Sequence, residues 1–429
     1  MQRYESWGRF PASTPAHVVP LEWESEIPRL DSIGGTLLAY GLGRSYGDVC
    51  LNNGGTLLDT SRLSRFRRFD RENGLLECEA GASLDDILRL IVPAGWFLPV
   101  TPGTKFVTVG GCIANDVHGK NHHRAGTFGR WVRSFELRRS DGTIRCSPEQ
   151  NRELFEATIG GLGLPGLITA AEIQLRRIES AYLMTEGIPF RSLEGFQAIS
   201  DASDSTHEYT VAWFDSGAGR DARGIFFRGN HSAVAGKART RRALKLPLAP
   251  FAPLLNSFSV RAFNAAYYRA NQHGAERAQH YDPFFYPLDA IDNWNVAYGR
   301  KGFLQYQCVI PTAAGLEPVA EIVDRSARSQ LASFLTVIKK FSGLASPGLL
   351  SFPRAGTTVC LDFAAKHAEL FPMLDELDAI VAAAGGSVYP AKDARLAPAR
   401  FREFFPRWEK FAAHIDPKFS SSFWRRVTS

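Results

Sequence analysis

The stretch AYGLGRSYGD, residues 39–48, places three glycines directly after a short apolar run. Loops of this kind let main-chain N–H groups approach phosphate oxygens without a Cβ atom in the way. In a Rossmann dinucleotide site, such a loop leads directly into a helix. Here it leads into VCLNNGGTLLDTSRL, which has a second turn at 52–55 and an apolar, strand-like run at 56–58. The loop is therefore not part of a Rossmann fold.

After this loop, the sequence alternates short strands with one clear helix. GLLECEAGA (74–82) is typical of a strand. Ser83 has the properties of an N-cap, with Asp86 three residues later, and apolar residues then recur at helical spacing over 84–91. A proline and a glycine soon afterwards end the predicted helix.

Two further glycine-rich segments follow, TPGTKFVTVGGCIANDVHGKNHHRAGTFG (101–129) and ATIGGLGLPGLIT (157–169). A β-hairpin with its turn at Asp141-Gly142 is predicted between them. The second segment ends in a predicted strand, after a short helix and a turn. Each loop alone could serve a tight turn, but three of them on short strands favour a backbone that lies along an extended polyphosphate ligand.

Length and composition indicate a soluble protein of more than one domain. The chain has 429 residues, with 45% hydrophobic and 22% charged residues. No run approaches the 18 or so apolar residues of a membrane span, and the first residues lack the apolar stretch of a signal peptide. We therefore expect a cytoplasmic location, with at most peripheral contact with a membrane.

The cysteines and histidines do not follow metal-site or disulfide patterns. The six cysteines are scattered singly, without a CxxC motif, so we expect reduced thiols. His122 and His123 are adjacent, and on an extended backbone their side chains would point in opposite directions. We expect no metal site.

The net charge of +6 is partly concentrated in basic clusters at 62–71 and 237–245. No zinc-finger, RNP or helix-turn-helix signature accompanies them, so we do not expect nucleic-acid binding. The second cluster opens KARTRRALKLPLAPFAPLLN (237–256), which continues as a Pro-broken apolar stretch. This stretch is either an ordinary long loop or a flap that contacts anionic lipid or an isoprenoid chain.

From about Ser180 the pattern indicates an α+β region with an antiparallel sheet. LQYQCV alternates in the manner of a half-buried strand, with Gln305 and Gln307 on one face. AGLEPVAEIVDRSARS and ELFPMLDELDAIVAAAGG are helical patterns between the strands.

The three glycine-rich segments resemble the FAD-binding domain of the vanillyl-alcohol-oxidase-type flavoproteins. Within that superfamily, the motifs HGKNHH, FLQYQ, CLDF and YPAKDAR are similar to those of the decaprenylphosphoryl-β-D-ribose oxidases, in the same order along nearly the whole chain. The resemblance implies a two-domain α+β fold of the VAO/PCMH type. An FAD-binding domain would take residues 1–177, a substrate domain with an antiparallel sheet 178–384, and the segment 385–429 would return to the FAD domain and active site.

By the same resemblance, the glycine-rich loops hold FAD. The first loop would wrap the pyrophosphate and reach the flavin edge, and Ile168 would lie on the adenine side. Covalent relatives carry a histidine just before the loop serine, where this chain has Arg44, so the resemblance implies noncovalent FAD. The implied cofactor residues are Gly41, Gly43, Arg44, Ser45, Tyr46, Gly47, Pro102, Gly103, Thr104, Gly110, Gly111, Ala114, Val117, His118, Ile168 and Tyr389.

The implied reaction is oxidation of a secondary alcohol on a sugar by hydride transfer to flavin N5. Lys392 would project into the reaction site, as a cation that stabilises negative charge or, if burial lowers its pKa enough, as a neutral base. Thr358 stands where the family carries an asparagine, which affects the hydrogen bonding of the pocket. The implied catalytic residues are Lys392, Lys120, His118, Gln307, Tyr46 and Cys360.

The family's substrate is a polyprenyl-phosphoryl ribose, oxidised at its 2′-hydroxyl during an epimerisation that a partner NAD(P)H-dependent keto-reductase completes. Two other interpretations remain open at this point. The chain could be a soluble alditol or aldonolactone oxidase of the same superfamily, acting on free polyols. It could also be a nonenzymatic protein whose basic surface binds nucleic acid or acidic lipid, with a steep salt dependence.

Overall fold

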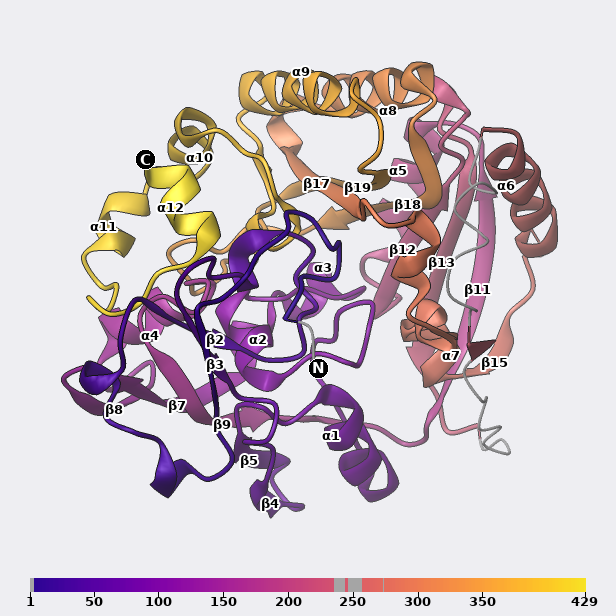
Figure 1. Ribbon diagram of the computed structural model, residues 1–429. Coiled ribbons are helices and arrows are strands. Elements are labelled where there is room, and N and C mark those ends of the chain that lie inside the picture. The colour runs from indigo at the N-terminus through magenta and orange to yellow at the C-terminus, as the bar shows by residue number, and fades with distance from the viewer. Residues whose placement is uncertain (1–3, 235–243, 246–256, 273) are drawn as a thin grey trace.

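The computed structural model (Figure 1) describes residues 4–234, 244–245, 257–272 and 274–429. The stretch 237–256, predicted to be a loop or a membrane-contacting flap, lies outside the described residues except for strand β14 (Leu244–Lys245). No helix in the described part of the chain is long and apolar enough to cross a membrane.

The N-terminal part of the chain forms two sheets. One is parallel and has the order β1 (His17–Pro20), β3 (Thr56–Asp59), β2 (Leu37–Tyr40). The other is antiparallel, in the order β4 (Phe66–Asp70), β5 (Leu75–Glu79), β9 (Leu167–Gln174), β7 (Val132–Arg139), β8 (Gly142–Cys146). A short ribbon pairs β6 (Trp96–Phe97) with β10 (Arg176–Arg177).

Local sequence signals in this part are confirmed. Helix α1 (Leu84–Ile91) begins after Ser83, whose hydroxyl accepts a hydrogen bond from the Asp86 N–H. The hairpin β7–β8 turns where predicted, with Arg139 opposite Gly142. The first glycine-rich loop leads into strand β3 without an α-helix between them. The other helices here are α2 (Val109–Ala114), α3 (His122–Ala125) and α4 (Arg152–Thr158).

The next part of the chain forms an eight-stranded antiparallel sheet. Its order is β15 (Arg277–His280), β11 (Tyr182–Phe190), β13 (Gly224–His231), β12 (Tyr209–Phe214), β18 (Ala332–Phe341), β19 (Gly356–Ala364), β17 (Phe303–Pro311), β20 (Ser387–Val388). Figure 1 shows helices α8 (Glu317–Ser329) and α9 (Leu370–Ala383) side by side along one edge of the view, above β17 and β19. Three further helices belong to this part: α5 (Leu193–Ser203), α6 (Ser257–Asn271) and α7 (Tyr281–Phe285).

The two faces of the eight-stranded sheet have different neighbours because side chains alternate along each strand. Leu304, Tyr306 and Cys308 of β17 join the core that α5, α8 and α9 cover. Gln305 and Gln307 point to the opposite face, as predicted. The prediction that this strand is half-buried was wrong, because that opposite face lines a cavity inside the molecule, and β17 is buried from 303 to 310.

The C-terminal helices pack back onto the N-terminal part of the chain. They are α10 (Pro398–Phe404), α11 (Trp408–Ala412) and α12 (Ser422–Thr428), and Figure 1 shows them, in yellow, beside the indigo N-terminal segments. Their apolar side chains share one core with Leu38 and Leu57 of the parallel sheet and with the sheet face under α8 and α9. The division at 177 and 385 into an FAD-binding and a substrate domain stays a prediction.

Candidate active site

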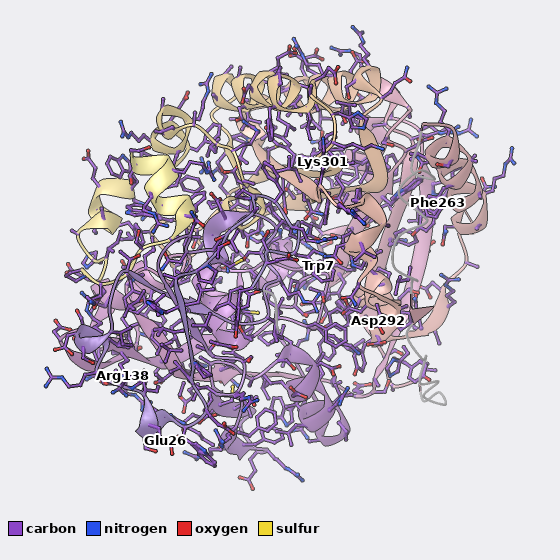
Figure 2. The ribbon with its side chains drawn as sticks, in the orientation of Figure 1. Trp7, Glu26, Arg138, Phe263, Asp292 and Lys301 are labelled. Carbon is purple, nitrogen blue, oxygen red and sulfur yellow. The ribbon has the colours of Figure 1, made fainter. Side chains whose placement is uncertain are left out.

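A cavity of about 530 Å³ lies between the N-terminal glycine-rich loops and the inner face of the eight-stranded sheet. Its wall includes Trp7, near the N-terminus, and Asp292, next to strand β14 in the two-residue strand β16 (Ile291–Asp292). Trp7 lies near the middle of the molecule in Figure 2, and Asp292 lies below it and to its right. Segments far apart in the sequence therefore meet at one site.

The structure brings nearly all the sequence-predicted residues to this wall. All six predicted catalytic residues line it, and so do all the predicted cofactor residues except Gly47. Gly47 instead backs the loop: a Cβ atom there would lie 1.6 Å from the Asp393 carbonyl oxygen. Its role is to let the loop approach the segment that carries Lys392.

The first glycine-rich loop is held from behind by the N-terminal segment. The Trp7 N–H donates to the Ser45 carbonyl oxygen at 2.8 Å, and the Tyr46 N–H donates to the Ala391 carbonyl oxygen at 2.9 Å. The Arg44 guanidinium lies over the Trp7 ring at 4.0 Å, and its Nε donates to the Phe106 carbonyl oxygen at 3.1 Å. Arg44 is thus fixed at the wall as a structural cation.

The second loop approaches the first closely because Gly41 has no Cβ atom at the contact. A Cβ atom on Gly41 would lie 2.6 Å from Oγ1 of Thr108, the residue that caps α2. Beyond α2, the Tyr389 hydroxyl donates to the Asn115 carbonyl oxygen at 2.9 Å. The buried Oδ1 of Asn115 has no hydrogen-bond partner in the described part of the chain.

A hydrogen-bonded row joins His118 to the sheet. Gln307 Nε2 lies 2.9 Å from His118 Nε2 and 3.2 Å from Thr358 Oγ1, whose hydroxyl donates to the Cys308 carbonyl oxygen. Because an amide N–H₂ only donates, His118 accepts at Nε2 and carries its proton on Nδ1. Burial, with Lys339 nearby, holds the pKa of His118 well below its usual value, so the imidazole is neutral.

A second row ends in Lys392. The Lys392 ammonium donates to Gln305 Oε1 and lies 3.8 Å from the centroid of the Tyr46 ring. Gln305 Nε2 donates to Asp362 Oδ1 at 2.5 Å, and the Tyr298 hydroxyl lies 3.3 Å from Asp362 Oδ2. Burial lowers the pKa of Lys392 and raises the pKa of Asp362 to about 7.

Two more lysines line the same cavity without a counter-charge among the described residues. Lys120 and Lys339 make no side-chain hydrogen bond or ion pair with the residues that the structure describes; Lys120 lies 5.7 Å from the centroid of the Phe284 ring. Burial lowers the pKa of Lys120 to about 8, and burial together with Lys120 lowers that of Lys339 to about 7. An anion in this part of the cavity would restore both lysines to their cationic forms.

The histidine pair differs from its prediction. His122 and His123 lie in the helical turn α3, not on an extended backbone, because Gly126 closes the turn by donating its N–H to the His122 carbonyl oxygen. The side chains still diverge: His122 packs on Phe341, with 4.3 Å between ring centroids, and His123 Nε2 lies 2.9 Å from the His207 carbonyl oxygen. All six cysteines are free thiols.

These residues fit the FAD that the resemblance implies. Three glycine-bearing loops form one continuous wall, and at Gly103 a Cβ atom would meet no protein atom within 4 Å, so that position is open toward the cavity. The unpartnered Asn115 Oδ1 and His118 Nδ1 are a buried acceptor and donor available to a polar ligand. The wall thus offers a cofactor close backbone approach and polar partners.

Comparison with known proteins agrees with this geometry. Residues 32–147 match the model of a family described as an FAD binding domain. The chain is 38% identical to the decaprenylphosphoryl-β-D-ribose oxidase of Mycolicibacterium smegmatis, over 99% of this chain and 97% of that protein. It is 33% identical to an uncharacterized Streptomyces coelicolor protein, over 80% and 99% of the two chains. It is 31% identical to human Δ(24)-sterol reductase over 30% of this chain and 25% of that protein.

The fold, the cavity and the matched domain define an FAD-dependent oxidoreductase with a two-domain α+β fold. The alignment with the Mycolicibacterium smegmatis protein covers nearly all of both chains, and it therefore defines the family as well as the class. The chain belongs to the decaprenylphosphoryl-β-D-ribose oxidase family.

Among the residues that sequence reasoning missed are Lys339 and Trp7, which line the cavity, and Asp362, which lies behind Gln305. Adjacent side chains on a strand point to opposite faces, so one of Lys339 and Lys340 was bound to face inward. Lys340 points outward and pairs with Asp201 and Asp204, at the end of α5, which leaves Lys339 to face the cavity. Asp362 lies in the motif CLDF but gave no sign of its partner Gln305, which comes from another strand. Trp7 gave no signal at all.

Proposed function

We propose that this protein oxidises the 2′-hydroxyl of a polyprenyl-phosphoryl ribose to the 2′-keto intermediate of an epimerisation, with noncovalently bound FAD. The name of the Mycolicibacterium smegmatis relative supports the sugar and lipid parts of this substrate. The observation that carries the proposal is the pair Lys120 and Lys339, which line the cavity without a counter-charge among the described residues. A substrate phosphate would supply that charge.

When bound, FAD supplies a hydride acceptor for the carbinol carbon. The protein must bind the sugar, orient its hydroxyl, take up the hydroxyl proton and balance the charge that develops there. His118, neutral and with Nδ1–H free of described partners, can donate to a substrate oxygen. Lys392 lies beside Tyr46 at the same wall, and as a cation it stabilises negative charge on an oxygen held there.

Arg44 supports the noncovalent attachment. An arginine side chain does not form the linkage to the flavin C8-methyl group that a histidine forms in covalent relatives. Here the Arg44 guanidinium is also held on Trp7 and on the Phe106 carbonyl oxygen. We therefore expect all the flavin to be released when the protein is denatured.

A keto product requires a second enzyme to complete an epimerisation. The carbonyl must be reduced from the opposite face, and an NAD(P)H-dependent keto-reductase is the class of enzyme that does this. A polyprenyl chain also partitions into a membrane, so the protein must meet its substrate at a membrane surface. The basic and apolar stretch 237–256 is the segment we propose for that contact.

The first test is an absorption spectrum of the purified protein, followed by acid precipitation. Flavin bands with yellow in the supernatant support noncovalent FAD, and yellow in the pellet overturns the argument from Arg44. Anaerobic mixing with a polyprenyl-phosphoryl ribose should then bleach the flavin and yield a ketone, whereas free alditols and aldonolactones should not. Bleaching by the free polyols alone would establish the soluble polyol oxidase instead.

A matched pair of variants tests the lysine argument. Lys339→Met should raise the KM for the phosphorylated substrate at least about tenfold, because one charge-assisted hydrogen bond is worth more than 1.4 kcal/mol. Lys340→Met, its neighbour on β18, removes a lysine that points outward to Asp201 and Asp204 and should leave KM unchanged. Equal effects of the two substitutions would contradict phosphate binding by Lys339.

A further inference from the structure

In the row Lys392–Gln305–Asp362, the two outer side chains determine the orientation of the Gln305 amide. An ammonium only donates hydrogen bonds and an ionised carboxylate only accepts them. The amide of Gln305 lies between the two, so it must present its oxygen to Lys392 and its N–H₂ to Asp362. With the amide reversed, N–H₂ would face the ammonium and the carbonyl would face the carboxylate.

Solvent water does not supply these hydrogen bonds, because both Gln305 and Asp362 are buried. Gln305 is 9% exposed and Asp362 is fully buried. The second oxygen of Asp362 faces the Tyr298 hydroxyl at 3.3 Å, so both described partners of the carboxylate are donors. Two hydrogen-bond donors and a nearby ammonium favour the ionised form of this buried carboxylate. Among the described residues, Gln305 is the side chain that connects it by a hydrogen bond to the cavity.

We propose that Asp362 is a positioning residue, which through the Gln305 amide fixes the Lys392 ammonium in its place and in its charged form. The proposal rests on the assignment of Lys392 to the reaction site under the proposed function. Asp362 does not line the cavity and so does not touch a ligand there. It acts on the reaction through two other side chains.

The electrostatics agree with this arrangement. Burial raises the pKa of Asp362 to about 7, while its hydrogen bond from Gln305 and the charge of Lys392 oppose that rise. Burial lowers the pKa of Lys392, which the Asp362 charge opposes. Each charge thus favours the other. The other titratable groups facing this row from the neighbouring elements are Tyr46, His118, Tyr298, Lys339 and Cys360.

Asp362→Asn keeps the shape but removes the charge and one of the two groups that orient the Gln305 amide. An asparagine can offer either an oxygen or an N–H₂ to Gln305, so the amide orientation then depends on Lys392 alone. An opposite charge within about 4–6 Å of an ionisable group moves the pKa of that group by about one unit or more. We therefore expect the titration midpoint of Lys392 to fall by about one unit in Asp362→Asn.

The measurement is direct and needs no substrate. The holoenzyme is prepared with ¹³C at the lysine Cε positions, and ¹H–¹³C spectra are followed across pH. The Lys392 signal is the one missing from Lys392→Arg. Asp375→Asn, which removes an exposed carboxylate of α9 that pairs with Arg395, is the matched control and should leave the midpoint unchanged.

A second variant separates action through the amide from a bare charge effect. Gln305→Met removes the link at nearly constant volume and should itself lower the Lys392 midpoint. If Asp362 acts through Gln305, adding Asp362→Asn to Gln305→Met lowers the midpoint by less than it does in the wild type. If Asp362→Asn folds poorly, Gln305→Met alone remains a test, because loss of the link must by itself lower the Lys392 midpoint, and an unchanged midpoint in that variant would overturn the inference.

An unchanged midpoint in Asp362→Asn, or strictly additive shifts in the double variant, overturns the inference. Neither result depends on which alcohol is oxidised. If polyprenyl-phosphoryl ribose fails to bleach the flavin while the Lys392 midpoint shifts as expected, the proposed substrate is wrong and the positioning role stands. If bleaching occurs without a shift, the substrate stands and Asp362 has no positioning role.

Discussion

Arg426 of α12 joins the two segments that carry Tyr46 and Lys392, and its removal should destabilise the protein strongly. Its Nε and Nη2 donate to the two oxygens of Asp48 at 2.9 and 2.8 Å, and Nη2 also donates to Asp393 at 2.9 Å. Asp48 ends the first glycine-rich loop, and Asp393 follows Lys392. Both carboxylate side chains are 3% exposed, whereas Arg426 is 25% exposed.

The size of the effect follows from what Arg426→Met leaves behind. Two buried carboxylates would lose the arginine that pairs with both of them, and removing one partner of a buried ion pair costs about 3–5 kcal/mol. Because Arg426 is partly solvated, we expect the lower end, about 3 kcal/mol at pH 7. Arg426→Lys keeps the charge but loses the fork geometry, so its loss should be about half as large.

The pH dependence provides a second signature. Burial already raises the pKa of Asp48 against the opposing effect of Arg426, so removing the arginine raises it further. A group whose folded-state pKa lies above its unfolded value opposes folding at higher pH and stops doing so as the pH falls through the folded pKa. The deficit of Arg426→Met should therefore be greatest at neutral pH and shrink on acidification.

Urea titrations of the holoenzyme, followed by protein and flavin fluorescence, measure these differences. Arg400→Met is the matched control, because it removes an exposed arginine that pairs with Glu403 in α10 and should cost less than about 0.5 kcal/mol. An Arg426→Met variant within about 1 kcal/mol of the wild type at pH 7 would refute the reasoning. So would a deficit that does not change between pH 7 and pH 5.

Three further predictions concern residues in or behind the wall of the cavity. Burial raises the pKa of Asp116 from 3.8 to about 6, so ionisation of this carboxylate opposes folding above that pH by about 3 kcal/mol. Asp116→Asn should therefore be more stable than the wild type at pH 7 and lose that advantage by pH 4. Urea titrations that give the same stability difference at both pH values would contradict this. Gly47→Ala should reduce the yield of folded protein, since its Cβ atom would overlap the Asp393 carbonyl oxygen. Gly103→Ala meets no protein atom and should fold normally, with a weaker FAD affinity if the cofactor lies against that position; unchanged FAD binding by fluorescence titration would place the cofactor elsewhere.

Local signals in the sequence were sufficient for the elements that local interactions define. The cap at Ser83, the turn at Gly142 and the alternation of Gln305 with its neighbours each depend on residues a few positions apart, and each was predicted correctly. The extended backbone at His122 was predicted wrongly, because the turn there depends on the conformation of Gly126 rather than on side-chain spacing. The glycine-rich loops predicted a phosphate-binding wall but not which parts of the chain close it.

The parts of the site that sequence could not supply are those that depend on which face of a strand meets another segment. Lys339 and Lys340 are adjacent and chemically identical, yet one lines the cavity and the other pairs with Asp201 and Asp204. Alternation requires that they diverge, but only the pairing of β18 between β12 and β19 decides which lysine points inward. A one-residue shift in that register would turn Lys340 inward in place of Lys339, and it would also move Val337 from the cavity wall into the core that Ile338 fills. The specificity of this site therefore rests on sheet register as much as on the identity of its lysines.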